Sequence, residues 1–128
     1  MRRAAAAAAV FALASLFASA APSASPRCTV TGTPGMDVLI GTAGRDVICG
    51  LGGDDVMDGV LGDDTLLGGP GNDILEGGAG SDVMLGGPGN DVLHAWDGRR
   101  DRVDGGAGRD RAWVDPTLDR VTGVERYR

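Results

Sequence analysis

The sequence predicts an all-β fold, a right-handed parallel β-roll that is built from short repeats and closed by a C-terminal cap. Three observations predict it: a strict nine-residue period, a glycine-rich half in every unit, and an apolar half too short for a helix. The period runs from Gly32 to His94 as seven units without an insertion. A strict short period is typical of a solenoid, in which each unit stacks on its neighbours.

Each unit is predicted to be a tight turn followed by a short strand. Glycine occupies the first and fourth positions, aspartate the sixth, and an apolar residue the eighth. Glycine at fixed positions favours a turn, because it adopts backbone conformations that other residues rarely reach. The unit ends, such as Val83-Met84-Leu85, are β-forming and too short for a helix.

The alternation of side chains along a strand assigns the faces of the roll. The eighth position is never charged and is predicted to face inward, whereas the ninth includes Asp58, Glu76 and His94 and is predicted to face outward. The apolar seventh position shares the outer face, and we interpret it as strand propensity on a partly exposed surface. Two units make one coil, parallel crossovers are right-handed, and units eighteen residues apart are expected to stack.

Stacking places the sixth-position aspartates in two rows, one at each edge of the roll. Carboxylates about 5 Å apart repel by roughly 3 kcal/mol per pair at an effective dielectric of 20, so each row favours a bound cation. Calcium accepts six to eight oxygen ligands, magnesium is smaller and holds its water, and zinc lacks suitable ligands with a single histidine in the chain. The predicted ligands are the carboxylates of Asp37, Asp46, Asp55, Asp64, Asp73, Asp82, Asp91 and Asp101, with backbone carbonyls of the turns near Gly50, Gly59, Gly68, Gly77 and Gly86.

The first segment is predicted to be a secretory signal peptide, residues 1–20. Arg2 and Arg3 precede an apolar stretch, and Ala18-Ser19-Ala20 offers a cleavage site between small residues. A retained membrane anchor is the alternative, because the apolar stretch is almost long enough to span a bilayer. Cleavage implies a secreted, extracellular protein with no membrane insertion. The remaining predicted boundaries are a linker or cap at 21–31, the roll at 32–113 (regular over 32–94, degenerate over 95–113), and a cap at 114–128.

The charge distribution limits the partners of the roll. Residues 32–94 carry eleven acids and only Arg45, whereas residues 95–128 carry seven acids and eight arginines. An acidic repeat block disfavours nucleic acid and anionic membranes, and it favours multivalent cations.

Cys28 and Cys49 are the only cysteines, and an even number in an exported chain predicts a disulfide. Two free thiols are the alternative. Extending the repeat frame backwards puts Cys28 at a sixth position and Cys49 at a ninth, roughly 11 Å apart. That separation exceeds the bridging limit of about 7 Å, so a disulfide requires the N-terminal segment to leave the frame.

The repeat block resembles the RTX, or hemolysin-type, calcium-binding repeat family. The units that begin at Gly68, Gly77 and Gly86 match its G-G-x-G-x-D-x-apolar-x pattern in full, whereas four units depart at the second position, with Thr33, Thr42, Leu51 and Val60. The resemblance implies a parallel β-roll with calcium between the turns of successive coils. A decayed roll that binds no ion is the alternative.

The repeat decays after His94. The segment from Ala95 to Asp104 has ten residues, and its Asp101 aligns with the sixth position. Stacked solenoids need atypical ends that cover the last core layer. The side chains that suit such a cap are Trp96, Trp113, Val121, Val124 and Tyr127. The alternative is that this arginine- and tryptophan-rich end binds an acidic glycan or a partner protein.

Enzyme signatures are absent from the sequence. There is no lysine for a P-loop, and the sole histidine, His94, supports neither a catalytic triad nor a zinc helix. We therefore expect a secreted calcium-binding protein without enzymatic activity that holds about five ions, which drive its folding. Two alternatives remain: an extracellular adhesive or cell-surface module that uses calcium as a scaffold, and a disordered segment with weak ion binding.

Overall fold

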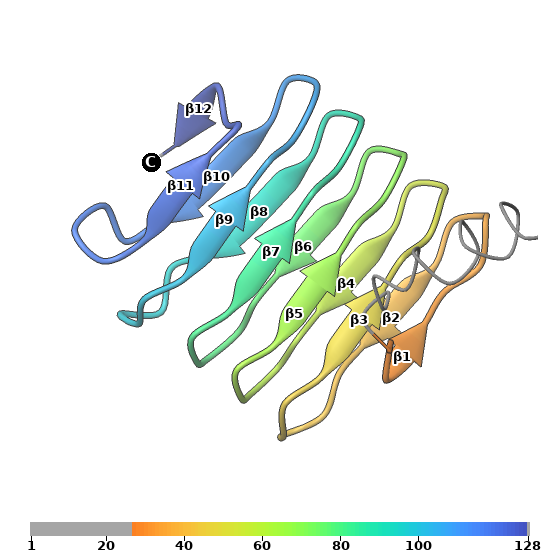
Figure 1. Cartoon of the computed structure of the whole chain (residues 1–128), viewed down its shortest axis with the longest axis horizontal. Helices are drawn as coiled ribbons and strands as arrows, with labels where there is room; N and C mark the ends of the chain where they lie inside the picture. Colours follow the sequence, from red (N-terminus) through yellow and green to blue (C-terminus); the bar gives the residue numbers. More distant parts are fainter. Residues whose placement is uncertain (1–26, 128) are drawn as a thin grey trace, which may run out of the picture.

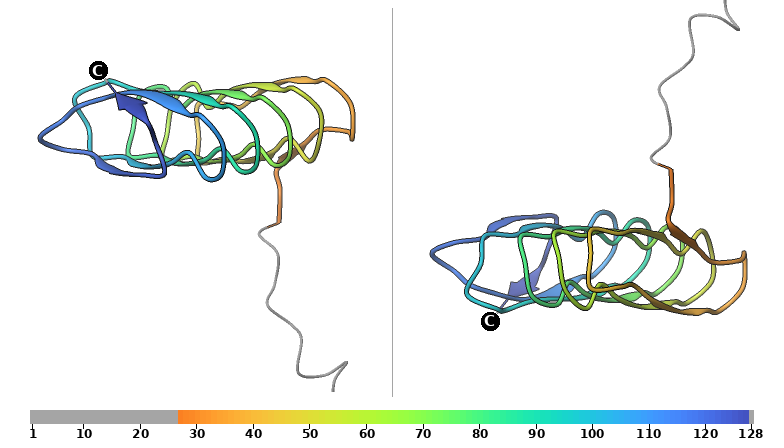
Figure 2. Two further views of the ribbon diagram at one scale, coloured as in Figure 1. Left: turned by 90° about the horizontal axis from the view of Figure 1, so that it is seen from above. Right: turned by 90° about the horizontal axis from the view of Figure 1, so that it is seen from below.

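The computed structural model describes residues 27–127, which form two parallel six-stranded sheets facing each other across a thin core (Figure 1). The chain alternates between the sheets at every strand, so each pair of consecutive strands completes one coil of a β-roll. Figure 2 shows the sheets as two flat walls joined by turns. Within residues 27–127 no helix long and apolar enough to cross a membrane is found. The predicted signal peptide lies outside the described residues.

Strand order follows the predicted stacking, because odd-numbered strands form one sheet and even-numbered strands form the other. Sheet A has the order β1-β3-β5-β7-β9-β11 and sheet B the order β12-β10-β8-β6-β4-β2. The strands are β1 (Val30–Thr31), β2 (Val38–Ile40), β3 (Val47–Cys49), β4 (Val56–Asp58), β5 (Thr65–Leu67), β6 (Ile74–Glu76), β7 (Val83–Leu85), β8 (Val92–Ala95), β9 (Arg102–Asp104), β10 (Arg111–Val114), β11 (Arg120–Thr122) and β12 (Arg126–Tyr127).

The coils stack in the register that the period predicts. Val38 of β2 pairs with Val56 of β4, which pairs with Ile74 of β6, each eighteen residues further along the chain. We name the coils by their residues: the first coil is 32–49, the second 50–67, the third 68–85, the fourth 86–104, and the fifth begins at 105. The all-β, parallel β-roll prediction is therefore confirmed.

The core is the column of eighth-position side chains, as predicted. Outer-face residues at the seventh position stay exposed, with Val38 at 70 % and Ile74 at 43 % of their full surface. Leu39, the eighth-position residue of the first coil, is only partly buried because no regular coil precedes it. The side chains with no exposed surface at this position are Ile48, Met57, Leu66, Leu75, Met84 and Leu93.

The ten-residue unit after His94 is absorbed without breaking either sheet. Strand β8 extends by one residue to Ala95, which is buried. Paired residues of β7 and β9 are therefore nineteen residues apart instead of eighteen, so that Met84 pairs with Val103. The Asp82 N–H donates to the Asp101 carboxylate across nineteen residues, which confirms that Asp101 occupies the sixth position. One extra residue is therefore accommodated within a single turn.

The N-terminal end of the roll is closed by a disulfide between Cys28 and Cys49, whose Cα atoms lie 5.9 Å apart. Val30 and Thr31 keep the repeat frame and pair with Ile48 and Cys49. The frame would place Cys28 beside Asp46, so the chain departs from it at Cys28, as the distance argument requires. In Figure 2 the first described residues turn away from the roll before β1. The roll thus begins slightly before the predicted boundary at Gly32.

The C-terminal end is only partly closed as predicted. Val121 and Val124 are partly buried and pack against the core, as expected of side chains that cover its last layer. The assignments of Trp96 and Trp113 to the cap were wrong: Trp96 is 71 % exposed, and Trp113 lies on the outer face of sheet B, where it stacks on His94 at 4.6 Å. Both tryptophans occupy outward positions because strand alternation overrides their size. The side chain of Tyr127 lies outside the described residues.

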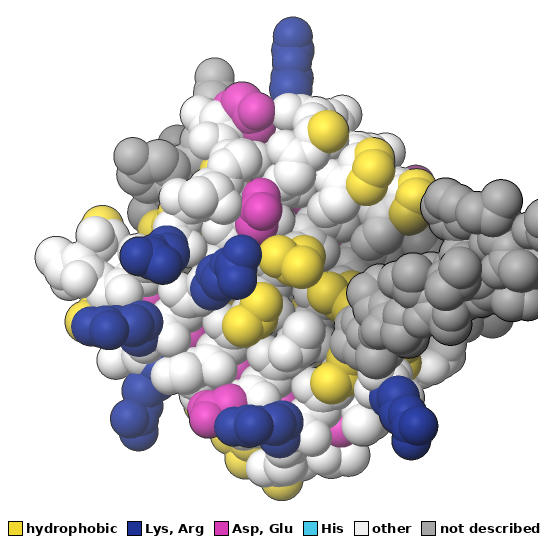
Figure 3. Space-filling view, in the orientation of Figure 1, with side chains coloured by type: hydrophobic (Ala, Val, Ile, Leu, Met, Phe, Trp, Pro, Cys, Tyr) yellow, Lys and Arg dark blue, Asp and Glu magenta, His cyan; other side chains and the backbone are white. Residues whose placement is uncertain are grey.

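The outer surface separates apolar from basic regions. Figure 3 shows arginine side chains gathered over the C-terminal coils of the front sheet, with apolar side chains between them and the N-terminal end. Among the residues described, the one ion pair joins Arg45 to Asp63, at 3.5 Å. The arginines of the C-terminal coils therefore make no direct ion pair with the acidic rows in this part of the chain.

Candidate metal centres in the turns

The sixth-position aspartates form two buried rows, one along each edge of the roll. Each lies immediately before a strand, at the point where the turn enters the sheet. Asp37 is half-buried, because it begins its row in the first coil. The remaining members expose at most 4 % of their surface: Asp46, Asp55, Asp64, Asp73, Asp82, Asp91, Asp101 and Asp110.

From Asp55 onward, one oxygen of each carboxylate joins successive coils. The Asp55 N–H donates to Asp73 Oδ1 at 2.8 Å, and the Asp73 N–H donates to Asp91 Oδ1 at 2.8 Å. The same contact links Asp46 to Asp64 at 2.7 Å in the other row. Aspartates two units apart are therefore linked by a hydrogen bond from the backbone of one to the carboxylate of the other.

The second oxygen has no hydrogen-bond partner over most of each row. A buried carboxylate oxygen without a donor is costly, because it has lost its hydration without gaining a replacement. The repetition of this feature in successive coils indicates a ligand position rather than a local defect. The unpartnered atoms are the Oδ2 atoms of Asp55, Asp64, Asp73, Asp82, Asp91, Asp101 and Asp110.

The first-position glycines place a carbonyl oxygen beside these unpartnered atoms. A Cβ added to Gly68 would lie 2.5 Å from Asp73 Oδ2 and 2.5 Å from the carbonyl oxygen of Gly86 in the next coil. A side chain is excluded there because a carboxylate oxygen and a carbonyl oxygen face the same space. The same pair of oxygens recurs at Gly50, Gly59, Gly86 and Gly105, beside Asp55, Asp64, Asp91 and Asp110.

Burial makes the aspartates in the middle of the rows hard to ionise. It raises the pKa of Asp73 and Asp82 to about 6 and that of Asp91 and Asp101 to about 7. The N–H of the preceding aspartate partly offsets this effect, and neighbouring carboxylates add to it. A cation beside Oδ2 would supply the charge compensation that these groups lack.

The first coil differs from the others. Asp37 Oδ2 accepts hydrogen bonds from the Thr33 N–H at 2.6 Å and the Thr33 hydroxyl at 2.9 Å. Asp46 Oδ2 accepts the equivalent bonds from Thr42, at 2.6 and 2.8 Å. These bonds, led by the one from the Thr42 N–H, lower the pKa of Asp46, whereas burial raises that of Asp64 in the next coil.

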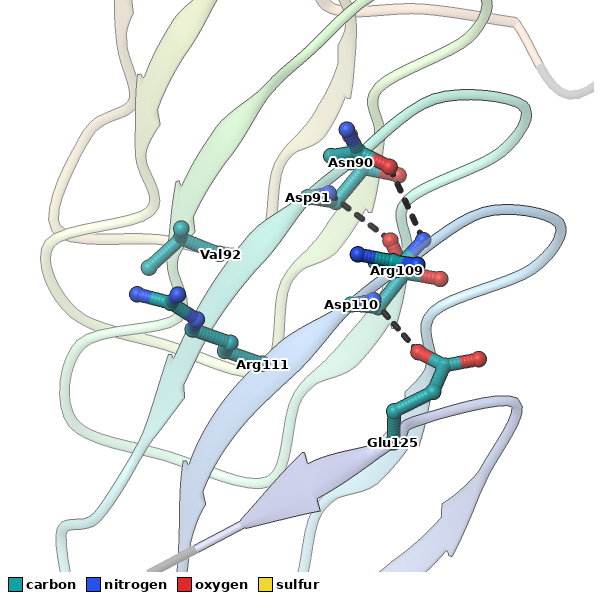
Figure 4. Close-up of a pocket in the computed structure, with 7 residues that line it drawn as sticks. All are labelled: Asn90, Asp91, Val92, Arg109, Asp110, Arg111 and Glu125. Atoms are coloured by element: carbon teal, nitrogen blue, oxygen red, sulfur yellow. Dashed lines mark hydrogen bonds between the residues drawn. The ribbon is translucent and has the colours of Figure 1, made fainter.

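The C-terminal ends of the rows include acidic residues that the sequence analysis did not assign to a site. Figure 4 shows the end of one row, where the Asp91 N–H donates to Asp110 Oδ1 at 2.7 Å and the Asp110 N–H donates to Glu125 Oε2 at 2.5 Å. In the other row the Asp101 N–H donates to Asp119 Oδ1. The Gly105-Gly-Ala-Gly pattern contained the signal for Asp110, whereas Glu125 has no repeat around it.

These positions fit a hard cation bound largely by backbone oxygens. Among residues 27–127 no three histidine, cysteine or acidic side chains lie close enough together to hold a metal ion by themselves, so a zinc site made of side chains is not present there and any ion would also need backbone oxygens. Calcium accepts carboxylate and carbonyl oxygens in a flexible geometry, and both kinds converge at the turns. Carbonyls of Gly68, Gly77 and Gly86, three of the five glycines predicted to mark the sites, face the unpartnered carboxylates. The carbonyls of Gly50 and Gly59 face Asp37 and Asp46.

Comparison with known proteins agrees with this geometry. The family model of the RTX calcium-binding nonapeptide repeat matches in four copies, over residues 31–66, 58–93, 67–100 and 97–115. No curated protein matches the sequence. The matched segments cover more than half of the chain and extend over the two degenerate units that follow the regular repeats, so the chain belongs to the RTX family of calcium-binding repeat proteins.

Proposed function

We propose that calcium bound between the stacked turns drives the folding of this protein, and that the protein works as a secreted calcium-binding module. The observation that carries the proposal is the series of seven buried Oδ2 atoms without a partner. An ion at these positions would bind the buried carboxylate oxygens, which otherwise destabilise the folded roll, and would turn them into stabilising ligands. Binding free energy would then appear as folding free energy.

The thin core supports a requirement for the ion. Each regular unit after the first contributes one fully buried apolar side chain at its eighth position, whereas ordering the backbone costs about 1–2 kcal/mol per residue. The rows add buried carboxylates that repel one another. Without a counter-ion these terms favour the unfolded chain, which hydrates every carboxylate.

About five ions are expected. Five of the unpartnered oxygens also face a glycine carbonyl of the next coil, namely those of Asp55, Asp64, Asp73, Asp91 and Asp110. Asp82 and Asp101 lie next to the ten-residue unit, where the repeat has no first-position glycine, and they are proposed as weaker positions.

A calcium titration tests the proposal. Circular dichroism should show β-structure appearing with calcium and disappearing in excess chelator, and calorimetry should count several ions per chain. Magnesium at the same concentration is the matched control, because it demands a more rigid octahedral set and should produce little β-structure. A β-signal that persists in chelator, or no binding at 10 mM calcium, would show that the roll is a decayed repeat.

Secretion remains a proposal that rests on two features. The basic and apolar start with its Ala18-Ser19-Ala20 site is typical of a signal peptide, and a Cys28–Cys49 disulfide suits an oxidising compartment. Cell fractionation and N-terminal sequencing of the exported protein test it, and a mature start near residue 21 is the expected result. Binding without catalysis is likewise proposed, because no catalytic constellation was found in the sequence.

A second candidate function is an adhesive or cell-surface module that uses calcium as a scaffold. Exposed Trp96, the stacked His94 and Trp113, and Glu76 line a pocket of about 300 Å³ on the outside of sheet B. Aromatic faces beside a free carboxylate are suited to a saccharide or to an organic cation. Tryptophan fluorescence in calcium-saturated protein, titrated with cell-wall glycans and with choline, tests this function, and Trp96→Ala is the matched control variant.

A further inference from the structure

We infer that Thr33 and Thr42 take the place of calcium in the first coil, so that ion binding begins at the second coil. The two threonines are then specificity-determining residues, which decide where along the roll an ion is held. The inference rests on the proposed calcium function and adds the position at which the ion array starts.

The geometry at Thr42 supplies the two donors that an Asp46 carboxylate oxygen needs. The N–H and the hydroxyl of Thr42 both donate to Asp46 Oδ2, while the Gly44 N–H donates to the threonine oxygen at 3.2 Å. Because that oxygen already accepts the glycine N–H, its single proton is directed toward the carboxylate. The Thr33, Gly35 and Asp37 trio repeats this arrangement.

The other oxygen of Asp46 is also occupied. The Thr29 hydroxyl donates to Asp46 Oδ1 at 3.1 Å, in the place where the N–H of a preceding aspartate would lie in a later coil. Three threonine donors therefore surround one carboxylate at the start of this row. The same coil is closed by the Cys28–Cys49 disulfide. This end of the roll is thus satisfied by covalent and hydrogen bonds.

The backbone φ angle at the second position of each unit also distinguishes the first coil from the later coils, independently of the hydrogen bonds. At the second position of the units, Gly69, Gly78, Gly87 and Gly106 have positive φ, from 82° to 97°. Leu51 and Val60 also adopt positive φ, 76° and 75°, although residues other than glycine rarely do so, and a β-branched residue such as Val60 least of all. Neither Thr33 nor Thr42 adopts it.

Leu51 and Val60 show that the conformation does not depend on glycine. Such a conformation is strained for a residue other than glycine and persists where the surroundings require it, often at a functional site. The turns of Leu51 and Val60 contain Asp55 and Asp64, whose Oδ2 atoms have no partner. The turns of Thr33 and Thr42 contain aspartates whose Oδ2 atoms are satisfied. A turn with positive φ at its second position therefore occurs where the aspartate Oδ2 has no partner, and a threonine turn without positive φ occurs where Oδ2 is satisfied.

Ion counting on the full chain tests the inference. Calcium bound per chain is measured by native mass spectrometry and calorimetry for wild type, for Asp37→Asn with Asp46→Asn, and for Asp55→Asn with Asp64→Asn. Asparagine keeps an oxygen that accepts the backbone or threonine donors, so all three proteins are expected to fold. The first double variant should bind as many ions as wild type, and the second should bind two fewer.

A reciprocal change tests the role of the hydroxyls. Thr33→Gly with Thr42→Gly should add two ions per chain, because each turn loses its hydroxyl donor and can adopt positive φ. Thr33→Ser with Thr42→Ser keeps both hydroxyls and should leave the count at the wild-type value. Loss of two ions on Asp37→Asn with Asp46→Asn, or no gain in the glycine variant, would overturn the inference. Absence of calcium from every protein would instead overturn the proposed function.

Discussion

The unpartnered oxygen of Asp73 gives the sharpest test of the calcium site, because its removal should have opposite effects with and without the ion. In Asp73→Asn, the amide oxygen still accepts the Asp55 N–H, while an NH₂ group replaces Oδ2 and faces the Gly86 carbonyl. Without calcium the substitution removes a buried, unsatisfied charge. The free energy of unfolding should then rise by about 1–3 kcal/mol.

With calcium the same substitution removes a ligand. At a dissociation constant of about 10⁻⁴ M, typical of the tighter extracellular calcium modules, 10 mM calcium stabilises the folded state by about 2.7 kcal/mol per site. The calcium-dependent part of the free energy of unfolding should therefore fall by about that amount in the variant. Urea unfolding followed by circular dichroism measures it, with sucrose added to both samples so that the ion-free state stays folded.

Asp54→Asn is the matched control for Asp73→Asn. Asp54 carries the same charge at the edge of the roll, but it is exposed, and its Oδ1 accepts the Asn72 N–H, which asparagine also permits. Its calcium-dependent stabilisation should match that of wild type. Equal destabilisation by Asp73→Asn in calcium and in chelator would refute the reasoning, since it would show that Oδ2 acts through packing alone.

Three further predictions follow from the turns and the N-terminal end. In chelator, the raised pKa values of Asp73 (about 6) and Asp91 (about 7) mean that the stability contributed by these protonated carboxyls is present below about pH 4 and is lost as pH rises through 6 to 7. Circular dichroism between pH 4 and pH 8 should show β-structure falling, and a rise would contradict the burial of these carboxyls. Gly68→Ala should prevent folding even in calcium, because its Cβ would lie 2.5 Å from two oxygens; a wild-type calcium midpoint would rule out the close approach. Reduction of Cys28–Cys49 should lower the free energy of unfolding by roughly 3 kcal/mol without changing the number of ions, and a lost ion would mean that the first coil binds calcium.

The repeat made most of the fold predictable. Glycine spacing located the turns, the uncharged eighth position located the core at Leu66 and Leu75, and the period of two units fixed the stacking. These inferences succeeded because each concerns a local rule that every coil repeats. The aligned position of Asp101 could also be predicted, since one extra residue does not change the order of the turn and strand.

The ends of the roll could not be predicted in the same way. Trp96 and Trp113 have the size of cap residues, but the alternation of inward and outward side chains places them outside. Which residues point inward cannot be predicted from the sequence once the nine-residue period is lost. The roles of Thr33 and Thr42 depend on the rotation of one peptide group in each turn, which the spacing of residues does not reveal. Glu125 completes a row from a segment without a repeat, so only the three-dimensional structure brings it beside Asp110.

The pairing of every coil with the coil eighteen residues away restricts how such a protein can change in length. Duplication or deletion of one whole coil, such as 68–85, leaves each remaining strand in its sheet and each aspartate in its row. Loss of a single nine-residue unit would instead move every later strand to the opposite sheet and join the two rows out of order. Internal duplications of eighteen residues therefore lengthen this array without disturbing its ends, whereas duplications of nine exchange its two faces.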